Sequence, residues 1–319
     1  MRVGFSLRRG TGMSKFIVAG ITQLETIVKV KELPIEFTPY TGEPDTIYIS
    51  AGGDAFNESL ALKWLGDEVE FMTVVGENQD LSIFNPSDRE VSLPTEYVLP
   101  IIKETPKEVL LYDARRKKQH FEDLKDIRDA KYDMTIVEPL VPGCDMMVLS
   151  NVNFCRPFIP LAKDNDKLLA VKIHTFKREK EIYNEDFLKN ANIIFFNDNS
   201  IDEEPYEFVK GMAAKYDPEI IILGQGGQGA IIYDKNKDFI VHYNAVKSVH
   251  IVNTAGAGNA FFACFLHYYQ KTGDSKAAIH KALLFAANKI GYMGTSNGFM
   301  TEDQLEQWEN LVWNPRGQM

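Results

Sequence analysis

The residues NTAGAGNAFF at positions 253–262 form a glycine-rich stretch without a charged side chain. The stretch follows the β-rich residues VHIV and precedes the helical pattern AFFACFLHYYQ. A glycine-rich turn that opens a helix presents unpaired backbone N–H groups, and the helix dipole adds partial positive charge. The small residues Gly256, Ala257 and Gly258 would let a phosphate group reach these amides. The stretch therefore predicts an anion site, although a tight turn with glycines chosen for their backbone angles explains the same residues.

Two better-known phosphate-binding motifs do not fit this chain. No Gly-Lys-Ser/Thr follows Gly258, so the stretch is not a P-loop. GQGGQG at 224–229 fits Gly-x-Gly-x-x-Gly, but the next residues, AIIYD, have a strand pattern. A dinucleotide-binding fingerprint has to open a helix. We therefore interpret GQGGQG as a hairpin turn that approaches a nucleotide edge-on.

A second glycine pair lies in GGDAFN at 52–57, between a predicted strand and a predicted helix. Glycines at such a junction admit a ligand close to the backbone. Asn57, one turn into the helix, can both donate and accept hydrogen bonds. The alternative is an ordinary loop with Asn57 on the solvent face.

Polar residues also follow the buried-strand pattern FFND at 195–198. Ligands in open α/β sheets gather beyond the carboxyl ends of the strands, which favours Asn197 and Asp198 as ligand contacts. Asp198 is equally suited to cap a helix. The histidines lack metal-ligand spacing, and His174 is the one that stands at a predicted strand end.

The elements around these residues indicate a parallel sheet with helices on its faces. Strand patterns at 15–21 and 69–76 enclose a helical pattern at 52–66 that begins and ends with glycine. This succession of strand, helix and strand is typical of α/β proteins. We expect further strands at 46–50, 145–151, 167–173, 192–197 and 219–223, hairpins over 108–121 and 229–244, a short helix within 156–166, and helices around 206–216, 256–269, 275–292 and 301–313.

Composition excludes several classes of protein. The net charge of −10 argues against a nucleic-acid partner, because phosphate neutralisation needs clustered Lys and Arg. No apolar run approaches 18 residues, so we expect no membrane span. Three cysteines without Cys-x-x-Cys spacing indicate a reducing compartment, such as the cytoplasm, and neither zinc nor disulfides. Residues 1–12 lack an apolar signal segment, and we interpret them as a leader or a segment that is not native to the protein.

In their order along the chain, these stretches resemble the ribokinase-like, or PfkB, family of carbohydrate kinases. The resemblance runs from about residue 15 to residue 313. The matching residues are the glycine pair and asparagine Gly52, Gly53 and Asn57, the strand-end Asn197, the turn 224–229 in place of the family's T-L-G-x-x-G, and residues 253–259 in place of its D-T-x-G-A-G-D signature.

The resemblance implies one α/β domain over residues 13–319, with a doubly wound sheet flanked by helices. A small β lid would come from about residues 24–50 and 95–122. The implied activity is transfer of the γ-phosphoryl group of ATP, with Mg²⁺, to a hydroxymethyl group of a sugar or nucleoside-like alcohol. Homodimers through the lid are common among similar proteins.

The resemblance also assigns roles to individual residues. Gly256, Ala257 and Gly258 would form the anion hole for the transferred phosphoryl group, and Asn259 stands at the general-base position. The remaining implied sites are an acceptor site of Glu25, Gly52, Gly53 and Asn57, a nucleotide site of Asn197, Gly224, Gly226 and Gly229, and a metal ligand at Asp198.

The departures from the family pattern fall on carboxylates that handle protons or metal. Asn259 replaces the aspartate base, and an amide cannot take a proton at physiological pH. A general base contributes roughly 10²–10⁴ in rate, whereas positioning and electrostatics carry much of phosphoryl transfer. The sequence therefore predicts a slow kinase. The other departures are Asn253 for the leading Asp, Glu25 for an Asp five residues after Gly20, Ser200 for the Glu of N-x-x-E, and Gly224 for a Thr.

A second hypothesis is a catalytically degenerate member of the family that binds a sugar or nucleotide as a sensor or partner protein. The loss of carboxylates at Asn253, Asn259 and Ser200 together motivates this alternative.

Overall fold

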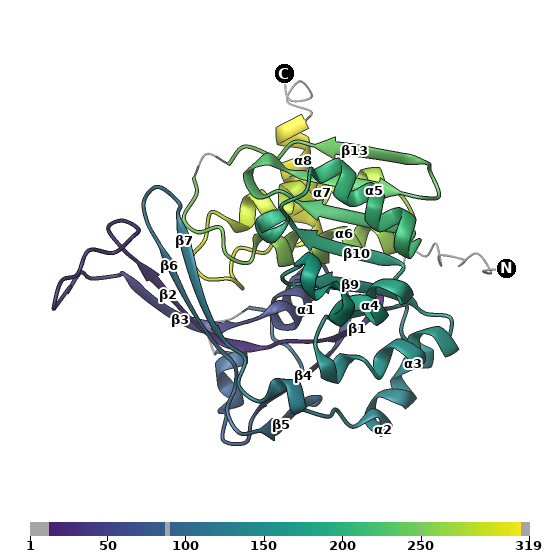
Figure 1. The fold of residues 1–319 in the computed structure, drawn as a ribbon, viewed down its shortest axis with the longest axis horizontal. Helices are drawn as coiled ribbons and strands as arrows, with labels where there is room; N and C mark the ends of the chain where they lie inside the picture. Colours follow the sequence, from purple (N-terminus) through teal and green to yellow (C-terminus); the bar gives the residue numbers. More distant parts are fainter. Residues whose placement is uncertain (1–12, 87–89, 249, 314–319) are drawn as a thin grey trace.

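The computed structural model describes residues 13–86, 90–248 and 250–313, so the predicted leader at 1–12 lies outside the described residues. A nine-stranded sheet forms the centre of the fold (Figure 1). The neighbouring strands from β11 to β5 are parallel, and β12 and β13 form an antiparallel hairpin at one edge. In spatial order the strands are β13 (Phe239–Tyr243), β12 (Ala230–Asp234), β11 (Ile220–Gly224), β10 (Ile193–Asn197), β9 (Leu168–Ile173), β8 (Met146–Ser150), β1 (Lys15–Ala19), β4 (Glu68–Gly76) and β5 (Val98–Ile102).

Helices cover both faces of this sheet. Phe16 and Val18 of β1 point into one core and Ile17 and Ala19 into the other, as expected for a strand buried on both faces. The first core includes residues of α1 (Asp54–Trp64), α6 (Ala257–Thr272), α7 (Ser275–Lys289) and α8 (Glu302–Trp313), and the second those of α2 (Met134–Val137), α3 (Phe158–Asp164), α4 (Glu181–Asn190) and α5 (Pro205–Tyr216).

A separate four-stranded sheet projects from the large one, to the left in Figure 1. Its strands, in spatial order, are β3 (Ile47–Gly52), β2 (Gln23–Lys29), β6 (Lys107–Tyr112) and β7 (Lys118–Asp123). The predicted lid range 95–122 therefore begins too early. The first strand in this range, β5, pairs in parallel with β4 of the large sheet. Its residues Val98 and Ile102 are buried there.

Strand ends and turns agree with the sequence patterns at the positions that carry candidate residues. Asn197 and Gly224 are register partners at the carboxyl ends of β10 and β11. GQGGQG joins the antiparallel strands β11 and β12, which confirms the hairpin interpretation. In the part of the chain that the structure describes, no helix has both the length and the apolar character needed to cross a membrane.

Candidate functional site

Helix α6 begins at the glycine-rich stretch that the sequence singles out. Gly256 precedes its first turn with a φ of 77°, and a Cβ at this position would lie 2.2 Å from the carbonyl oxygen of Thr295. Glycine is therefore required both by the backbone angle and by the contact. Within the described residues no side chain caps α6, and a helix leaves the N–H groups of its first turn without partners of its own. The N–H of Ala257 donates a long hydrogen bond, of 3.4 Å, to the carbonyl of Thr254, so among the described residues the amides of Gly258 and Asn259 are the ones that remain available to an anion.

Asn259 lies in this first turn and is buried. Its Oδ1 has no hydrogen-bond partner among the described residues. An unpaired buried polar atom costs about 1–3 kcal/mol, so a ligand that donates a hydrogen bond to Oδ1 would recover this cost.

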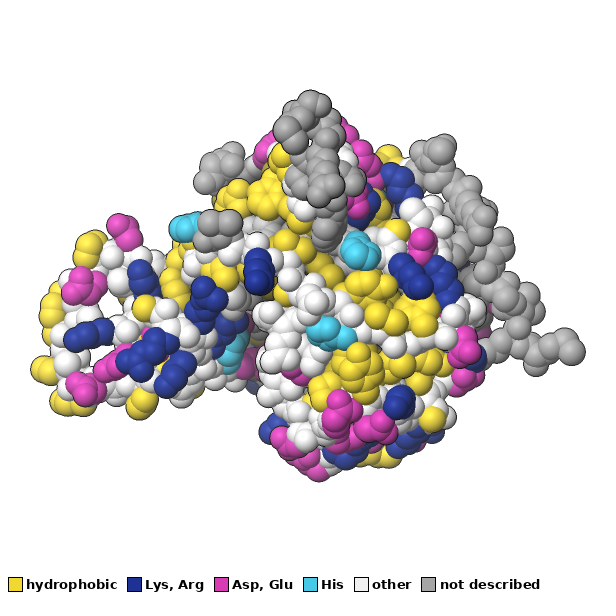
Figure 2. Space-filling view, turned by 90° about the horizontal axis from the view of Figure 1, so that it is seen from above, with side chains coloured by type: hydrophobic (Ala, Val, Ile, Leu, Met, Phe, Trp, Pro, Cys, Tyr) yellow, Lys and Arg dark blue, Asp and Glu magenta, His cyan; other side chains and the backbone are white. Residues whose placement is uncertain are grey.

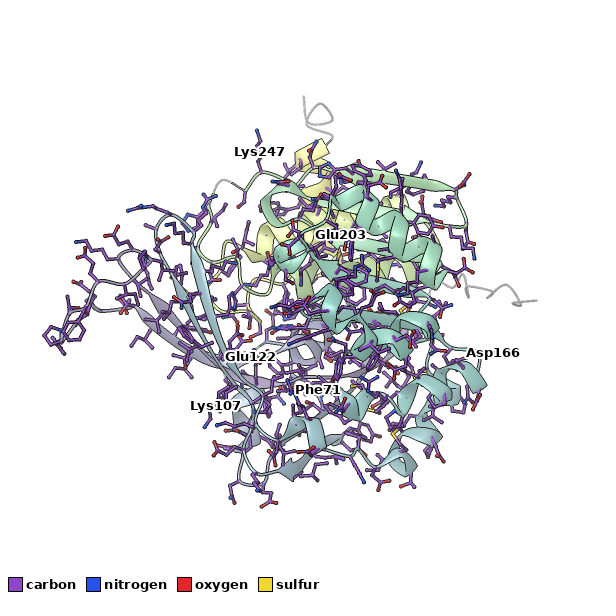
Figure 3. The ribbon with its side chains drawn as sticks, in the orientation of Figure 1. Phe71, Lys107, Glu122, Asp166, Glu203 and Lys247 are labelled. Atoms are coloured by element: carbon purple, nitrogen blue, oxygen red, sulfur yellow. The ribbon has the colours of Figure 1, made fainter. Side chains whose placement is uncertain are left out.

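A cavity of about 430 Å³ joins the start of α6 to the inner face of the small sheet. It brings together seven residues to which the sequence assigns a site: Glu25, Gly53, Asn57, Asn197, Gly256, Gly258 and Asn259. Glu122 lines the same cavity from β7 (Figure 3). The other predicted site residues, namely Gly52, Ala257, Asp198, Gly224, Gly226 and Gly229, are not among those that line it.

Glu25 is held at the base of this cavity by three groups. The backbone N–H of Gly53 donates to its Oε1 at 2.9 Å, Gln23 donates to the same oxygen at 3.3 Å, and the hydroxyl of Thr295 donates to Oε2 at 2.5 Å. Burial raises the pKa of the Glu25 carboxyl to about 7, although the hydrogen bond from Thr295 opposes this shift. The carboxyl is therefore poised between its charged and neutral forms near neutral pH.

The glycine pair makes room for the Glu25 side chain and donates a hydrogen bond to it. A Cβ on Gly52 would lie 2.0 Å from Cδ of Glu25, so the absent side chain makes room for the carboxyl group. From the sequence, these glycines were expected to admit a ligand. In the structure Gly52 admits the Glu25 side chain, and Gly53 supplies a hydrogen bond to it.

Asn57 is 1% exposed, which rules out the alternative that places it on the solvent face. Its Oδ1 lies 3.4 Å from Oγ1 of Thr295. Thr295 therefore contacts two predicted acceptor-site residues with its side chain, and it contacts Gly256 with its backbone. No sequence motif marks Thr295, because it follows α7 in an irregular segment far along the chain.

A buried ion-pair cluster forms another wall of the cavity. Lys172 of β9 donates to Asp54 at 2.7 Å, and His174 Nδ1 lies 3.0 Å from the second oxygen of Asp54. Burial opposes ionisation of Asp54, but the charges of Lys172 and His174 outweigh it and hold its pKa well below the usual range. Asp54 in turn raises the pKa of His174 to about 9, so His174 is a cation at neutral pH. His174 was singled out from the sequence, whereas Lys172 was missed, although a lysine inside an apolar buried-strand pattern is a signal that could have identified it.

A second cavity, of about 890 Å³, is lined by residues that precede α6 and by residues of α7 and α8. Residues 242–248 form one wall, and α7 and α8 supply His280, Leu283 and Trp308. Gly229 of the β11–β12 turn packs against the backbone of residues 243–245 in this wall. Asn197 lines the first cavity beside the start of α6, because its Oδ1 would be 3.2 Å from a Cβ on Gly258.

The metal-binding prediction rests on Asp198 alone. Ser200, which stands where the family has a glutamate, donates its hydroxyl to the carbonyl of Phe176 at 2.8 Å. Asp198 is half-buried, and burial raises its pKa. In the described ranges no group of three or more His, Cys, Asp or Glu side chains could hold a metal ion.

Comparison with known proteins agrees with this geometry. The profile of the pfkB family carbohydrate kinases matches residues 178–302. The solved structure of Arabidopsis thaliana ribokinase complexed with ribose and ATP superposes with a TM-score of 0.75, at 13% identity, over 93% of this chain and 99% of that one. The carboxyl-terminal part of the chain thus matches the model of the pfkB carbohydrate kinases, and the chain as a whole has the ribokinase-like fold. The ribokinase-like fold class predicted from the sequence is thereby confirmed.

Two curated relatives mark how far the likeness to PfkB proteins extends. A deoxyribokinase of Salmonella typhi is 38% identical over 91 residues, but these cover only 28% of this chain and 29% of that protein. The ribokinase of Dictyostelium discoideum is 22% identical over 317 residues, which cover 90% of this chain and 98% of the relative. The Salmonella relative is thus similar over a short stretch at higher identity, whereas the Dictyostelium relative is similar over most of the chain at low identity.

The contact between Gly52 and Glu25 is the most directly testable feature of this site. We expect Gly52→Ala to lower the free energy of unfolding by about 1–3 kcal/mol, because the added methyl group overlaps the Glu25 carboxyl. In a Glu25→Ala background the same substitution should cost much less, since the overlap is gone. Urea unfolding of the four proteins measures both costs.

Gly211→Ala is the control, because a Cβ on Gly211 meets open space in the helical interior of α5. It should leave stability unchanged or raise it slightly. Equal costs of Gly52→Ala in the two backgrounds would contradict the described position of Glu25.

Proposed function

We propose that the protein transfers the γ-phosphoryl group of ATP to a hydroxymethyl oxygen of a sugar or nucleoside-like alcohol, slowly because Asn259 stands at the general-base position. One observation supports this most strongly. A single cavity contains both the uncapped first turn of α6 and the hydrogen-bonding residues Glu25 and Asn57. Such a cavity can hold a polyhydroxylated molecule with one hydroxyl group next to a bound phosphoryl group.

Different residues would bind the transferred phosphoryl group and the acceptor. The amides of Gly256, Ala257 and Gly258 would bind the transferred phosphoryl group, where aligned N–H groups stabilise developing negative charge. Glu25 and Asn57 would orient the acceptor through its other hydroxyl groups. The unpaired Oδ1 of Asn259 can accept a hydrogen bond from the attacking hydroxyl and so orient it, but it cannot take the proton. The site would therefore still position the attacking hydroxyl group, but it would lack a group that removes its proton.

The nucleotide would occupy the larger cavity and reach toward α6 past the β11–β12 turn. Gly226 and Gly229 lie in that turn, and Asn197 and Gly224 lie side by side at its base. The apolar and aromatic side chains of the cavity suit the base of ATP. Mg²⁺ would neutralise charge on the phosphate oxygens, and Asp198 is its candidate ligand.

The small sheet would act as the lid of a single domain over residues 13–319. Its strands β2, β6 and β7 line the cavity through alternate residues that include Glu25, Glu108 and Glu122. A lid of this kind excludes water from the phosphoryl acceptor.

The second candidate function is binding without catalysis. Two observations favour it: the amide of Asn259 at the base position, and the use of Ser200 as a structural hydrogen-bond donor in place of a metal-organising carboxylate. Such a protein would bind a sugar or nucleotide in the same two cavities as a sensor.

Phosphoryl transfer from ATP to a panel of pentoses, hexoses and nucleosides, with and without Mg²⁺, decides between the two functions. We expect measurable turnover that Asn259→Asp raises by about 10²–10⁴-fold, because a carboxylate can take the acceptor proton. Asn253→Asp is the matched control. Its Oδ1 accepts a hydrogen bond from the N–H of Ala255 at 2.6 Å within the loop, so this variant should not gain activity.

Turnover of the wild type that Asn259→Asp fails to raise would refute a rate limit at Asn259. If neither protein transfers phosphate while calorimetry detects sugar or nucleotide binding, the sensor function is the correct one.

We also propose a homodimer through the outer face of the small sheet. Ile49, Thr26, Val109 and Phe121 form a row across its four strands by their register, on the face opposite Glu25, Glu108 and Glu122. Ile49 and Phe121 are 65% and 52% exposed. Figure 2 shows hydrophobic side chains at the surface of this projecting part, at the left. A contiguous apolar face of this kind marks an interaction site in a soluble protein.

Ile49→Asp should convert the dimer to a monomer, because it places an unpaired charge in the centre of the proposed interface. Analytical ultracentrifugation at micromolar protein concentration measures the change. Ile182→Asp, at a similarly exposed position on α4, should leave the dimer intact. A wild-type protein that sediments as a monomer would overturn the proposal.

A further inference from the structure

Lys289, the last residue of α7, is fully buried. Its ammonium donates a hydrogen bond to the carbonyl of Gly294. No carboxylate forms an ion pair with it among the described residues. Burying a charge without an ion-pair partner costs free energy. A lysine is therefore an unexpected residue at this position unless its charge has a role in the site.

The segment that follows Lys289, residues 290–298, contacts the proposed acceptor site, the glycine-rich loop and the small sheet. Its Thr295 donates to Glu25 at 2.5 Å, and the same residue lies under Gly256 at the start of the anion-binding turn. Asn297 donates to the hydroxyl of Tyr48 in the small sheet at 2.8 Å. The carbonyl of Ile290 accepts hydrogen bonds from the N–H groups of residues 252 and 253, which lead into the glycine-rich loop.

The bond from Lys289 holds the peptide unit that leads to Thr295. Gly294 has a φ of 85°, and its carbonyl belongs to the peptide group that leads directly to Thr295. A rotation of this peptide group would move the Thr295 hydroxyl away from Glu25 and would release the contact with Gly256.

We propose that Lys289 is a positioning residue, which holds the acceptor-binding carboxyl of Glu25 and the anion-binding turn at Gly256 in one geometry through the Gly294 carbonyl and Thr295. The proposal rests on the proposed function, since it assigns Glu25 to the acceptor. It adds a residue that touches neither acceptor nor nucleotide and acts through Thr295.

Electrostatics supports the same connection. Burial lowers the pKa of Lys289 to about 7, while the negative charge of Glu25 from β2 favours its charged form and the positive charge of Lys118 from β7 disfavours it. For Glu25, burial is the largest cause of the raised pKa, and the carboxylate of Glu108 from β6 raises it further. The two buried groups therefore stabilise each other's charged forms, so removal of the Lys289 cation should raise the pKa of Glu25.

The substrate-free test follows the titration of Glu25 by NMR of the side-chain carboxyl carbon in ¹³C-glutamate-labelled protein, with Glu25→Gln to assign the signal. We expect Lys289→Met to raise the titration midpoint of Glu25, because the nearby cation is gone. Thr295→Val should raise it as well, because the charged form loses a hydrogen bond. Lys281→Met is the matched control: it lies on the same helix, pairs with Glu309 outside the cavity, and should leave the midpoint unchanged.

The kinetic test uses the acceptor that the phosphoryl-transfer panel identifies. In Lys289→Met the acidic limb of kcat/KM for the acceptor should move to higher pH together with the Glu25 midpoint. Thr295→Val should raise KM by about tenfold, the loss expected for a hydrogen bond to a charged group. Thr295→Ser, which keeps the hydroxyl group, should retain most of the affinity.

A merely structural role predicts a different result. Lys289→Met would then change thermal stability while the Glu25 midpoint and the acidic limb stay in place, and this outcome overturns the proposal. Absence of turnover in the wild type would overturn the proposed function, but the NMR titration would still decide whether Lys289 acts on Glu25.

Discussion

The hydrogen bond between Thr295 and Glu25 is the interaction on which the rest of the site depends. It joins a segment after α7 to the second strand of the chain, and the same threonine lies under the first glycine of the anion-binding turn. The large sheet brings β10 and β11 to this point, and α7 anchors the segment through Lys289. In the proposed function, this bond therefore helps to set the distance between the acceptor and the phosphoryl group.

In the proposed function, groups that bind and orient the ligands are present, whereas a group that removes the acceptor proton is absent from the general-base position. One cavity would provide anion binding and acceptor orientation in this function, while the atom at the general-base position is an amide oxygen. Because the transition state of phosphoryl transfer is loose, deprotonation of the acceptor can lag behind bond cleavage. Loss of the base therefore slows such a reaction without abolishing the geometry that permits it.

The sequence predicted the parts of the fold that follow from local patterns. Apolar runs located the buried strands, and glycine-to-helix junctions located the starts of α1 and α6. Thr295 and Lys289 were missed because their roles arise from contacts between distant segments. The contact between Gly52 and Glu25 was missed for the same reason, since only the fold places the Glu25 carboxyl where a side chain on Gly52 would be. The approximate lid range 95–122 included the residues of β5, because the pairing of β5 with β4 leaves no local signature.

The most direct test of the central claim is a crystal structure of the protein with a non-hydrolysable ATP analogue. We expect the terminal phosphate to accept hydrogen bonds, at about 2.7–3.2 Å, from the backbone N–H groups of the first turn of α6. The base should lie in the large cavity beside α7. A bound analogue whose phosphates lie away from this turn would contradict the assignment of the glycine-rich stretch as the site of phosphoryl transfer.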